Sequence, residues 1–236
     1  MTLESLDNPV WASLQTRHAS LAVRLGGVSR YPTEIAPFVA IDPNAPGSLN
    51  DLAELVATGE TVCFVGPALA LHSDWIVDGP VPIAQMVCHS AIARVEGPDI
   101  VELSAAQVPE MLALTALVYP HYFRARTIEM GRYLGIYSGD MLVAMAGERM
   151  GMDRHQEISA VCTHPDFTGR GYAQRLVAEL SNAILDSGRL PFLHVSHANT
   201  RAKSLYQRMG YMHRADVALL TARPRAVRPH RSPSAG

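Results

Sequence analysis

Cysteine is scarce in this chain, which has 236 residues but only three cysteines, Cys63, Cys88 and Cys162. Their number is odd and their spacing is wide, so the sequence supports neither a disulfide framework nor a Cys-x-x-Cys metal site. We therefore expect no bound metal and a reducing, cytoplasmic environment. Excess charge of one sign is also lacking, because the formal net charge is only −2. A chain so close to neutrality has no general attraction for nucleic acid or an anionic membrane, and we expect neither as a partner.

Long apolar runs are also missing. Residues 1–7 (MTLESLD) lack the basic region and apolar run of a signal peptide. No stretch reaches the roughly eighteen consecutive apolar residues that a membrane-spanning helix needs. Apolar residues nevertheless make up 48% of the chain, which is ample for the core of one large domain or two small ones. We expect a soluble cytoplasmic protein, with a homodimer among the states it could adopt.

The first 96 residues contain no motif whose chemistry can be named. Local patterns predict a hairpin over 20–30 and a short helix over 48–56. Two apolar strands are predicted over 61–65 and 83–88, and the Gly- and Pro-rich segment 66–82 separates them. We interpret residues 1–96 as a smaller α+β domain that ends near the turn-forming group Glu96-Gly97-Pro98. It either covers a sheet face of the second domain or walls one side of a substrate cleft.

From Asp99 onward the pattern becomes regular, with strands and amphipathic helices in alternation. Strands are predicted over 99–103, 132–137, 141–149, 156–163, 191–195, 211–214 and 217–221. Helices are predicted over 104–118 and 126–130, from Ala173 to a stop at Gly188, and after a cap at Asn199. The fold class is α/β (α+β), with one domain over 97–221. The Arg- and Pro-rich tail, 222–236, has no acidic residue and is expected to be disordered.

The stretch Glu157–Gln174 joins an apolar strand, a Pro-punctuated turn and a glycine-rich bend that opens a helix. Such a bend leaves backbone N–H groups free to bind an anion, most plausibly a phosphate. A P-loop would need a lysine in this turn, and none is present. A dinucleotide fingerprint would need glycine at position 174, which is Gln, and an acidic residue after the next strand, which is missing. Both of these phosphate-binding motifs therefore fail.

Two motifs resemble those of the GNAT acetyltransferase superfamily. Gly171 and Ala173, preceded by the strand segment Val-Cys-Thr-His-Pro over 161–165, resemble the acyl-CoA signature Gln/Arg-x-x-Gly-x-Gly/Ala. The segment from Asn199 to Tyr211 resembles the family's Asn-x-x-Ala-x-x-Leu-Tyr-x-x-x-Gly-Phe/Tyr motif. The resemblance covers about residues 99–221 and implies a mixed, mostly antiparallel central sheet with flanking helices. Thr168 departs from it, because the family usually has Gln or Arg there, and one side-chain contact is thereby weakened.

The resemblance implies acetyl-CoA as co-substrate. By family analogy, the Val161 N–H would bond the thioester carbonyl, and the Thr163 backbone would pair with pantetheine amides like an added strand. The N–H groups of 169–173 would hold the pyrophosphate, with Arg170 adding a charge and Asn199 contacting pantetheine. The full set of expected cofactor-binding residues is Val161, Cys162, Thr163, Thr168, Gly169, Arg170, Gly171, Tyr172, Ala173 and Asn199.

Two catalytic residues follow from the same resemblance. Tyr206 stands where the family's general acid protonates the departing thiolate, and Glu157 resembles in position a general-base glutamate. For Glu157, a strand-end carboxylate paired to a cation is an equal alternative, and a water relay could replace the base. The acceptor wall is expected around Tyr119, His121, Tyr122, Phe123 and Arg126, though packed aromatics would look the same.

We therefore predict an N-acetyltransferase that acts by direct attack of an amine on the thioester in a ternary complex. The acceptor is a small-molecule or peptide amine whose identity the sequence leaves open, because variable loops build such pockets. The alternative is a catalytically silent acyl-CoA-binding regulatory module.

Overall fold

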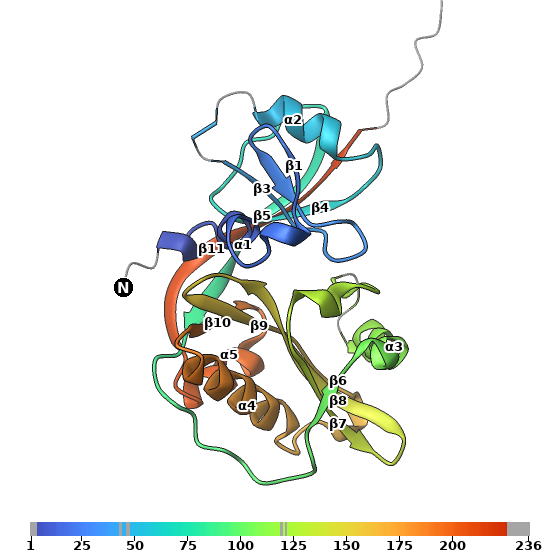
Figure 1. Ribbon diagram of the computed structural model, residues 1–236, viewed down its shortest axis with the longest axis vertical. Coiled ribbons are helices and arrows are strands. Elements are labelled where there is room, and N and C mark those ends of the chain that lie inside the picture. Colours follow the sequence, from blue (N-terminus) through green and yellow to red (C-terminus); the bar gives the residue numbers. More distant parts are fainter. Residues whose placement is uncertain (1–3, 43, 46–47, 119, 121, 226–236) are drawn as a thin grey trace, which may run out of the picture.

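The computed structural model describes residues 4–42, 44–45, 48–118, 120 and 122–225. An eight-stranded mixed sheet forms its centre, in the order β4-β11-β5-β10-β9-β8-β7-β6 (Figure 1). Only the β9–β10 pair in this sheet is parallel. The strands are β4 (Val62–Gly66), β5 (Trp75–Val87), β6 (Val101–Leu103), β7 (Tyr133–Ser138), β8 (Met141–Gly151), β9 (His155–Thr163), β10 (Leu190–Ser196) and β11 (Met212–Pro224). The predicted mostly antiparallel sheet is confirmed.

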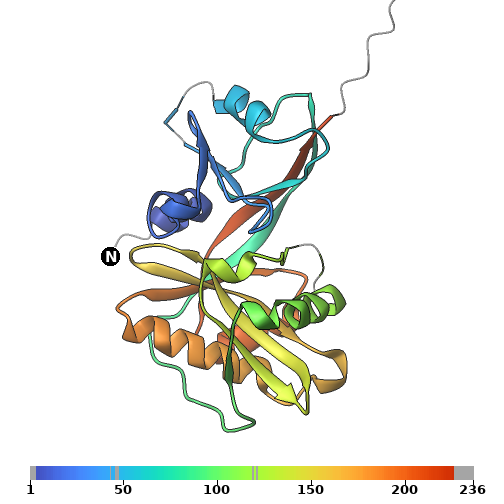
Figure 2. The same ribbon diagram turned by 45° about the vertical axis from the view of Figure 1, so that its right-hand side comes forward.

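Helices cover both faces of this sheet. On one face lie α4 (Tyr172–Asp186) and α5 (Thr200–Arg208), and on the other lie α3 (Val108–Val118) and α1 (Pro9–Gln15) (Figures 1 and 2). The other helical elements of the described chain are α2 (Ser48–Leu55) and five short 3-10 helices. The 3-10 helices are Glu4–Leu6, Ala19–Leu21, Ala105–Gln107, Thr127–Met130 and Pro165–Phe167. No helix in the described ranges is long and apolar enough to cross a membrane.

Helix α4 illustrates how the pattern forms the core. Leu176, Val177, Leu180 and Ile184 recur at helical spacing, and each is at most 1% exposed against the sheet. Burying such a side chain stabilises the fold by about 1.5–3 kcal/mol each, so this stripe fixes the helix on the sheet. On α3, Met111 and Leu114 are buried against the sheet, whereas the equally apolar Leu117 is 55% exposed.

Strand β5 comes from the first half of the chain and lies between β10 and β11. Ala84 and Met86 face α4 and α5, whereas Ile83 and Val87 face α1, as expected for a strand buried on both sides. The prediction placed only 83–88 in a strand and was wrong about the segment before it. Proline is tolerated there because the first half of β5 pairs with β11 alone, and its other edge needs no N–H donors.

Strand β11 is a single strand, although two strands were predicted over 211–214 and 217–221. Its register against β5 shifts between His213 and Ala215, and an irregularity at this point breaks the period-two pattern without ending the strand. The predicted disordered tail falls mostly on residues 226–236, which lie outside the described residues, while residues 222–224 belong to β11.

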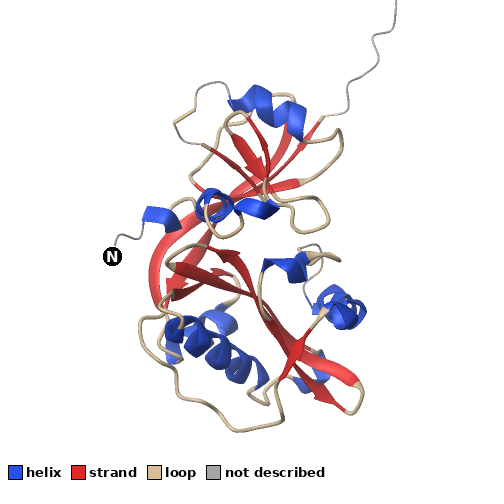
Figure 3. Cartoon of the chain, viewed as in Figure 1, coloured by secondary structure: helices blue, strands red, loops and turns tan. Residues whose placement is uncertain are grey.

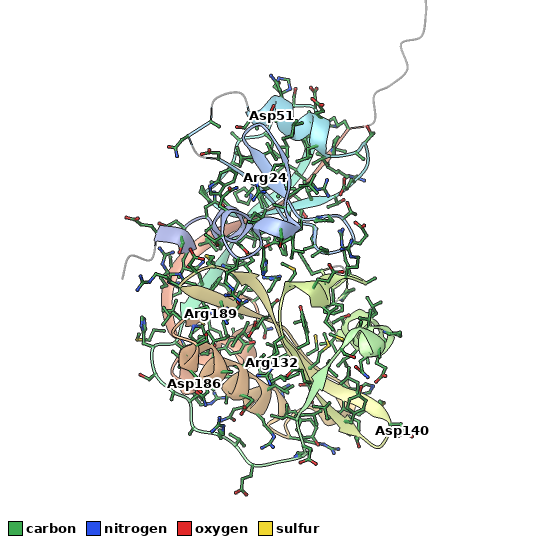
Figure 4. All side chains as sticks on the ribbon, viewed as in Figure 1. Arg24, Asp51, Arg132, Asp140, Asp186 and Arg189 are labelled. Carbon is green, nitrogen blue, oxygen red and sulfur yellow. The ribbon has the colours of Figure 1, made fainter. Side chains whose placement is uncertain are left out.

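The remaining N-terminal segments gather at one end of the molecule, and β5 and β11 run from the main body into them (Figures 1 and 3). A three-stranded sheet of β1 (Val23–Leu25), β2 (Val28–Arg30) and β3 (Val39–Ile41) packs with helix α2 (Ser48–Leu55). Asp51 of α2, labelled in Figure 4, accepts a 3.1 Å hydrogen bond from the Gly27 N–H of the hairpin turn. The domain boundary at residue 96 remains a prediction, and the central sheet itself crosses it.

Candidate active site

Strands β9 and β10 separate after three residue pairs. Their pairing runs only from Leu190↔His155 to Phe192↔Glu157, after which β10 continues along β5 as far as Ser196. In this described part of the sheet, β9 therefore has no strand neighbour on its β10 side beyond Glu157. The backbone polar groups along that edge are available to an extended ligand.

A β-bulge in β9 lies at this split. Met145 pairs with Cys162 and Gly147 pairs with Ser159, so two β9 residues oppose the single residue between them on β8. One of the two, Ala160, has φ 51, the left-handed conformation that a non-glycine residue rarely adopts. The bulge turns the outer part of β9 away from β10 and places the Val161 side chain against the α4 and α5 face.

A cleft of about 410 Å³ opens on this face, between the end of β9, the glycine turn and helix α5. Nine of the ten expected cofactor-binding residues line it, together with Tyr206. Its full lining is Val161, Thr163, Phe167, Thr168, Gly169, Arg170, Gly171, Tyr172, Ala173, Gln174, Asn199, Arg201, Ala202, Leu205, Tyr206 and Arg208. Cys162 and Glu157 do not line it. The glycine turn and α5 are about thirty residues apart in sequence, yet they line one cavity. Helix α4 and strand β10 connect them, and β10 runs parallel to β9, as a crossover connection requires.

The glycine turn forms an open cradle. Gly169 and Gly171 have φ 81 and 80, and a Cβ built on either would meet no other atom within 4 Å. Gly171 is the N-cap of α4 and supplies no side-chain acceptor for the first helical N–H groups. These donors and the positive end of the helix dipole fit a bound anion, so the turn suits the pyrophosphate of CoA.

Of the residues that the structure describes, three arginines and no acidic residue line the cleft. The guanidinium of Arg170 stacks over the Phe167 ring, with Cζ 4.6 Å from the ring centroid. Arg201 and Arg208 reach the cleft from α5, and sequence reasoning missed both of them. Their separation of seven residues, about two helical turns, was a usable signal because it places them on the same side of the helix.

Tyr206 combines burial with an available hydroxyl. It is 7% exposed at the inner part of the cleft, and within the described residues its hydroxyl has no hydrogen-bond partner. Burial raises the pKa of this hydroxyl, and the neighbouring Cys162 thiol adds to the shift. The side chain therefore stays protonated at neutral pH, as a proton donor must. Asn199 lines the same cleft and caps α5, its Oδ1 accepting a 3.1 Å bond from Ala202 N–H.

Glu157 lies on the opposite face of the sheet and is fully buried. Arg149 donates to it through Nε at 2.7 Å and Nη2 at 2.6 Å, and His194 Nδ1 donates at 2.7 Å. Gln85 Nε2 in turn donates to His194 Nε2 at 3.0 Å. Every side chain of this group has a partner within it, and the group borders the α1 side of the sheet, where Arg149 stacks on Phe38.

The pKa of Glu157 reflects this pairing. Burial acts to raise the pKa, but the charge of Arg149 and the hydrogen bonds from Arg149 and His194 outweigh it and lower the value to about 2. A carboxylate with so little proton affinity and no exposed surface is poorly suited to take a proton from an amine. The geometry argues against a direct base role for Glu157 and favours the alternative of a carboxylate paired to a cation.

Cys162 and the expected acceptor wall also contribute little to the cleft. The Cys162 side chain is 2% exposed on the α3 side, and burial raises the pKa of its thiol to about 12. Phe123 packs edge to face on Tyr133, with ring centroids 5.6 Å apart, and Arg126 pairs with Glu129 at the surface. Tyr119 and His121 lie outside the described residues. Among the residues that are described, no cluster of three His, Cys, Asp or Glu could hold a metal ion.

Comparison with known proteins matches the chain to one family model and to several solved structures of one fold. The family model described as FR47-like protein matches residues 133–219. A solved structure from Novosphingobium aromaticivorans, assigned as an acetyltransferase of the GNAT family, is 31% identical, covers 94% of this chain and 99% of its own, and has a TM-score of 0.87. A search of curated proteins found no match.

Two more distant structures share the fold. A GCN5-related N-acetyltransferase from Kribbella flavida is 18% identical, with 89% of this chain and 91% of its own covered and a TM-score of 0.59. A GNAT-family acetyltransferase from Colwellia psychrerythraea is 10% identical, with 95% and 98% covered and a TM-score of 0.51. These two matches cover most of both halves of the chain, so the shared fold includes much of the N-terminal half.

Proposed function

This chain belongs to the GNAT family, and on that premise we propose that it transfers an acetyl group from acetyl-CoA directly to an amine acceptor. The observation that carries the proposal is the meeting of three features in one cleft: the free edge of β9, the glycine cradle and the protonated Tyr206 hydroxyl. The β9 edge would bind the thioester carbonyl and the pantetheine arm, the glycine cradle would bind the phosphates, and Tyr206 would donate a proton.

Acetyl-CoA supplies the activated thioester, and the chain positions it. The backbone of Thr163 pairs with the pantetheine amides along the free edge of β9, and the Val161 N–H donates to the thioester oxygen. The N–H groups of 169–173 and the Arg170 charge hold the pyrophosphate, with Thr168, Tyr172 and Ala173 forming the surrounding wall. Asn199 closes the cleft from α5.

The acceptor nitrogen attacks the thioester carbon, the carbon–sulfur bond breaks, and Tyr206 donates its proton to the departing sulfur. The proton neutralises the departing thiolate, which would otherwise leave as an anion because its thiol has a pKa of about 8.5, and Tyr206 then regains a proton from water. The acceptor must also lose one proton, and because Glu157 is fully paired, we assign that step to a water relay. Glu157 instead positions Arg149 and His194 beside the split between β9 and β10.

One observation favours a second candidate, a catalytically silent acyl-CoA-binding module. Glu157, the carboxylate that the family resemblance offers as base, is locked in a buried ion pair. Such a protein would bind CoA in the same cleft without turnover. For either function we propose a cytoplasmic location, since the three cysteines are free and buried.

The test compares Tyr206→Phe with the native protein by thiol release from acetyl-CoA over a panel of amines and peptides. We expect a loss of about 100-fold in kcat, typical of removing a general acid, while CoA affinity changes less than about twofold. Tyr211→Phe is the matched control, because the Tyr211 hydroxyl shares a 2.8 Å hydrogen bond with Ser181 away from the cleft. Retained turnover in Tyr206→Phe contradicts the acid role. Native protein that binds CoA but turns over no amine in the panel supports the silent module.

A further inference from the structure

A second cavity lies on the α3 side of the sheet, across from the CoA cleft. It has a volume of about 390 Å³ and opens between helix α3, the β7–β8 hairpin and the residue after β9. Such a volume is ordinary for a small-molecule site, for which about 300–1,000 Å³ is typical. Its lining is Glu110, Ala113, Leu114, Leu117, Asp140, Met141, Leu142 and His164. None of these residues lines the cleft, and the proposed function makes no use of the cavity.

The apolar wall of this cavity is exposed to solvent in the described chain. Helix α3 is apolar on nearly every side, with Glu110 as its one charged residue. A helix of this kind is normally buried all round, yet Leu117 is 55% exposed. Met141, which lines the same cavity from the hairpin, is 44% exposed. Together the two side chains offer apolar surface from which a ligand would exclude water.

Two carboxylates give the cavity a negative charge. Glu110 Oε2 accepts a 2.6 Å hydrogen bond from the Tyr137 hydroxyl, which holds the carboxylate in place and leaves Oε1 without a partner among the described residues. Asp140, labelled at the end of the β7–β8 hairpin in Figure 4, has no hydrogen bond or ion pair within the described chain. The imidazole of His164 accepts a 3.3 Å bond from the Asp166 N–H at Nδ1. Since no described lysine or arginine lines the cavity, nothing within it neutralises the two carboxylates.

We infer that this cavity binds a small organic cation, a protonated amine on an apolar body. Leu117 and Met141 pack against the body, and the carboxylates of Glu110 and Asp140 accept from the ammonium group. Charge argues against a second copy of the chain as the occupant, because a two-fold contact between these faces would place like charges together. The inference is independent of the proposed function, since the cavity and the acetyl-transfer cleft have no residue in common.

The test compares phenethylamine with its neutral counterpart 2-phenylethanol by titration calorimetry at low salt. The two compounds share one apolar body, and phenethylamine is an ammonium ion at neutral pH because the pKa of such an amine is about 10. We expect the native protein to bind phenethylamine with a Kd of about 0.1 mM and 2-phenylethanol about tenfold more weakly. Equal affinity for the two compounds, or binding of neither, overturns the inference.

Three variants locate the bound amine. Glu110→Gln removes one charge at constant size, so phenethylamine should bind about fivefold more weakly while 2-phenylethanol stays within about twofold of native. Ala113→Lys puts a long cationic side chain into the cavity from an exposed position on α3 and should abolish binding of both compounds. Ala116→Lys is the matched control, because Ala116 is exposed on the same helix outside the cavity, and it should bind like native protein. Phenethylamine binding that Glu110→Gln and Ala113→Lys leave unchanged contradicts the inference, because the amine then lies elsewhere.

Light scattering of the same proteins tests the other occupant. We expect Ala113→Lys to keep the oligomeric state of the native protein. A native dimer that Ala113→Lys converts to a monomer would show that this face joins two copies, and the inference would fail. A native protein that binds phenethylamine in this cavity but transfers no acetyl group to any amine supports the inference and contradicts the proposed enzymatic function.

Discussion

The two faces of β9 differ in how their polar groups are satisfied. On the α4 and α5 face, the described chain provides no hydrogen-bond partners for three groups. They are the free edge of β9, the N–H groups of the open glycine cradle and the Tyr206 hydroxyl. The α1 face instead holds a buried hydrogen-bond network formed by Glu157, Arg149, His194 and Gln85. Buried polar groups are normally paired, so unpaired groups around a cavity indicate a ligand, whereas a closed network indicates a structural role.

The contrast shows why residue type alone is a poor guide to catalysis. From the sequence alone, Glu157 and Tyr206 are both candidates for a proton-transfer role, and only Glu157 has an equally good alternative as a carboxylate paired to a cation. Their surroundings distinguish the two residues. Tyr206 lines the cleft, whereas the Glu157 carboxylate is hydrogen-bonded to Arg149 and His194. Substitutions that leave one face intact and change the other test this contrast.

The largest effect is expected from Glu157→Gln. Removing one partner of a buried ion pair leaves the Arg149 charge uncompensated, which typically costs about 3–5 kcal/mol of unfolding free energy. Denaturant unfolding measures this loss, and Glu129→Gln is the matched control because its ion pair with Arg126 lies at the surface. If the variant is as stable as native protein and only turnover is lost, Glu157 acts as the base and the structural role is contradicted.

The same carboxylate gives the native protein a pH dependence. Its pKa is lowered to about 2 in the folded state, from an ordinary value of 4.5. A depressed pKa contributes stability that is complete above the unfolded value and is lost as the pH falls through the folded value. Between pH 4.5 and about 2, the unfolding free energy of the native protein should therefore fall by more than that of Glu157→Gln. Denaturant unfolding of both proteins at several pH values measures the difference.

Gly171→Asp is expected to weaken CoA binding by about 100-fold or more. A Cβ at this position meets no protein atom within 4 Å, so we attribute the loss to the negative charge beside the phosphates and to a φ of 80 that glycine tolerates best. Gly188→Asp is the matched control. It lies at the other end of α4 with φ 76 and equally open space, so it carries similar backbone strain but should bind CoA like native protein.

The smallest effect is expected from Tyr133→Phe. The Tyr133 hydroxyl is buried on the α3 side and has no hydrogen-bond partner among the described residues, so removing it should raise the unfolding free energy by about 1 kcal/mol. Tyr31→Phe should do the reverse, because the Tyr31 hydroxyl lies 2.8 Å from both Ser13 Oγ and His18 Nδ1. Thermal unfolding of the pair measures both signs, and a destabilised Tyr133→Phe would reveal a partner for this hydroxyl.

Local patterns predicted what local sequence determines. The hairpin at Gly26-Gly27, the apolar stripe of α4 and the glycine turn all depend on residues a few positions apart, and they lie where the sequence placed them. The cleft also gathers residues of both motifs, because a strand, a helix and a second strand with its helix fold back together.

Long-range pairing was beyond reach. His194 and Gln85, which complete the Glu157 network, lie 37 and 72 residues from that carboxylate, and β5 from the N-terminal half brings Gln85 into it. The first half of β5 was missed because its prolines suggest a loop unless one edge is known to be free. Which face of β9 would be closed depends on that sheet order, so the role of Glu157 could not be settled from sequence.

The most direct measurement of the central claim is amide hydrogen exchange of the native protein with and without saturating CoA. The account predicts slower exchange at the free edge of β9, residues 161–163, and at the glycine turn, residues 169–173, while amides around Glu157 on β9 keep their rates. Saturating CoA that leaves 161–163 and 169–173 exchanging as in the free protein would contradict it, because the bound nucleotide would then lie elsewhere.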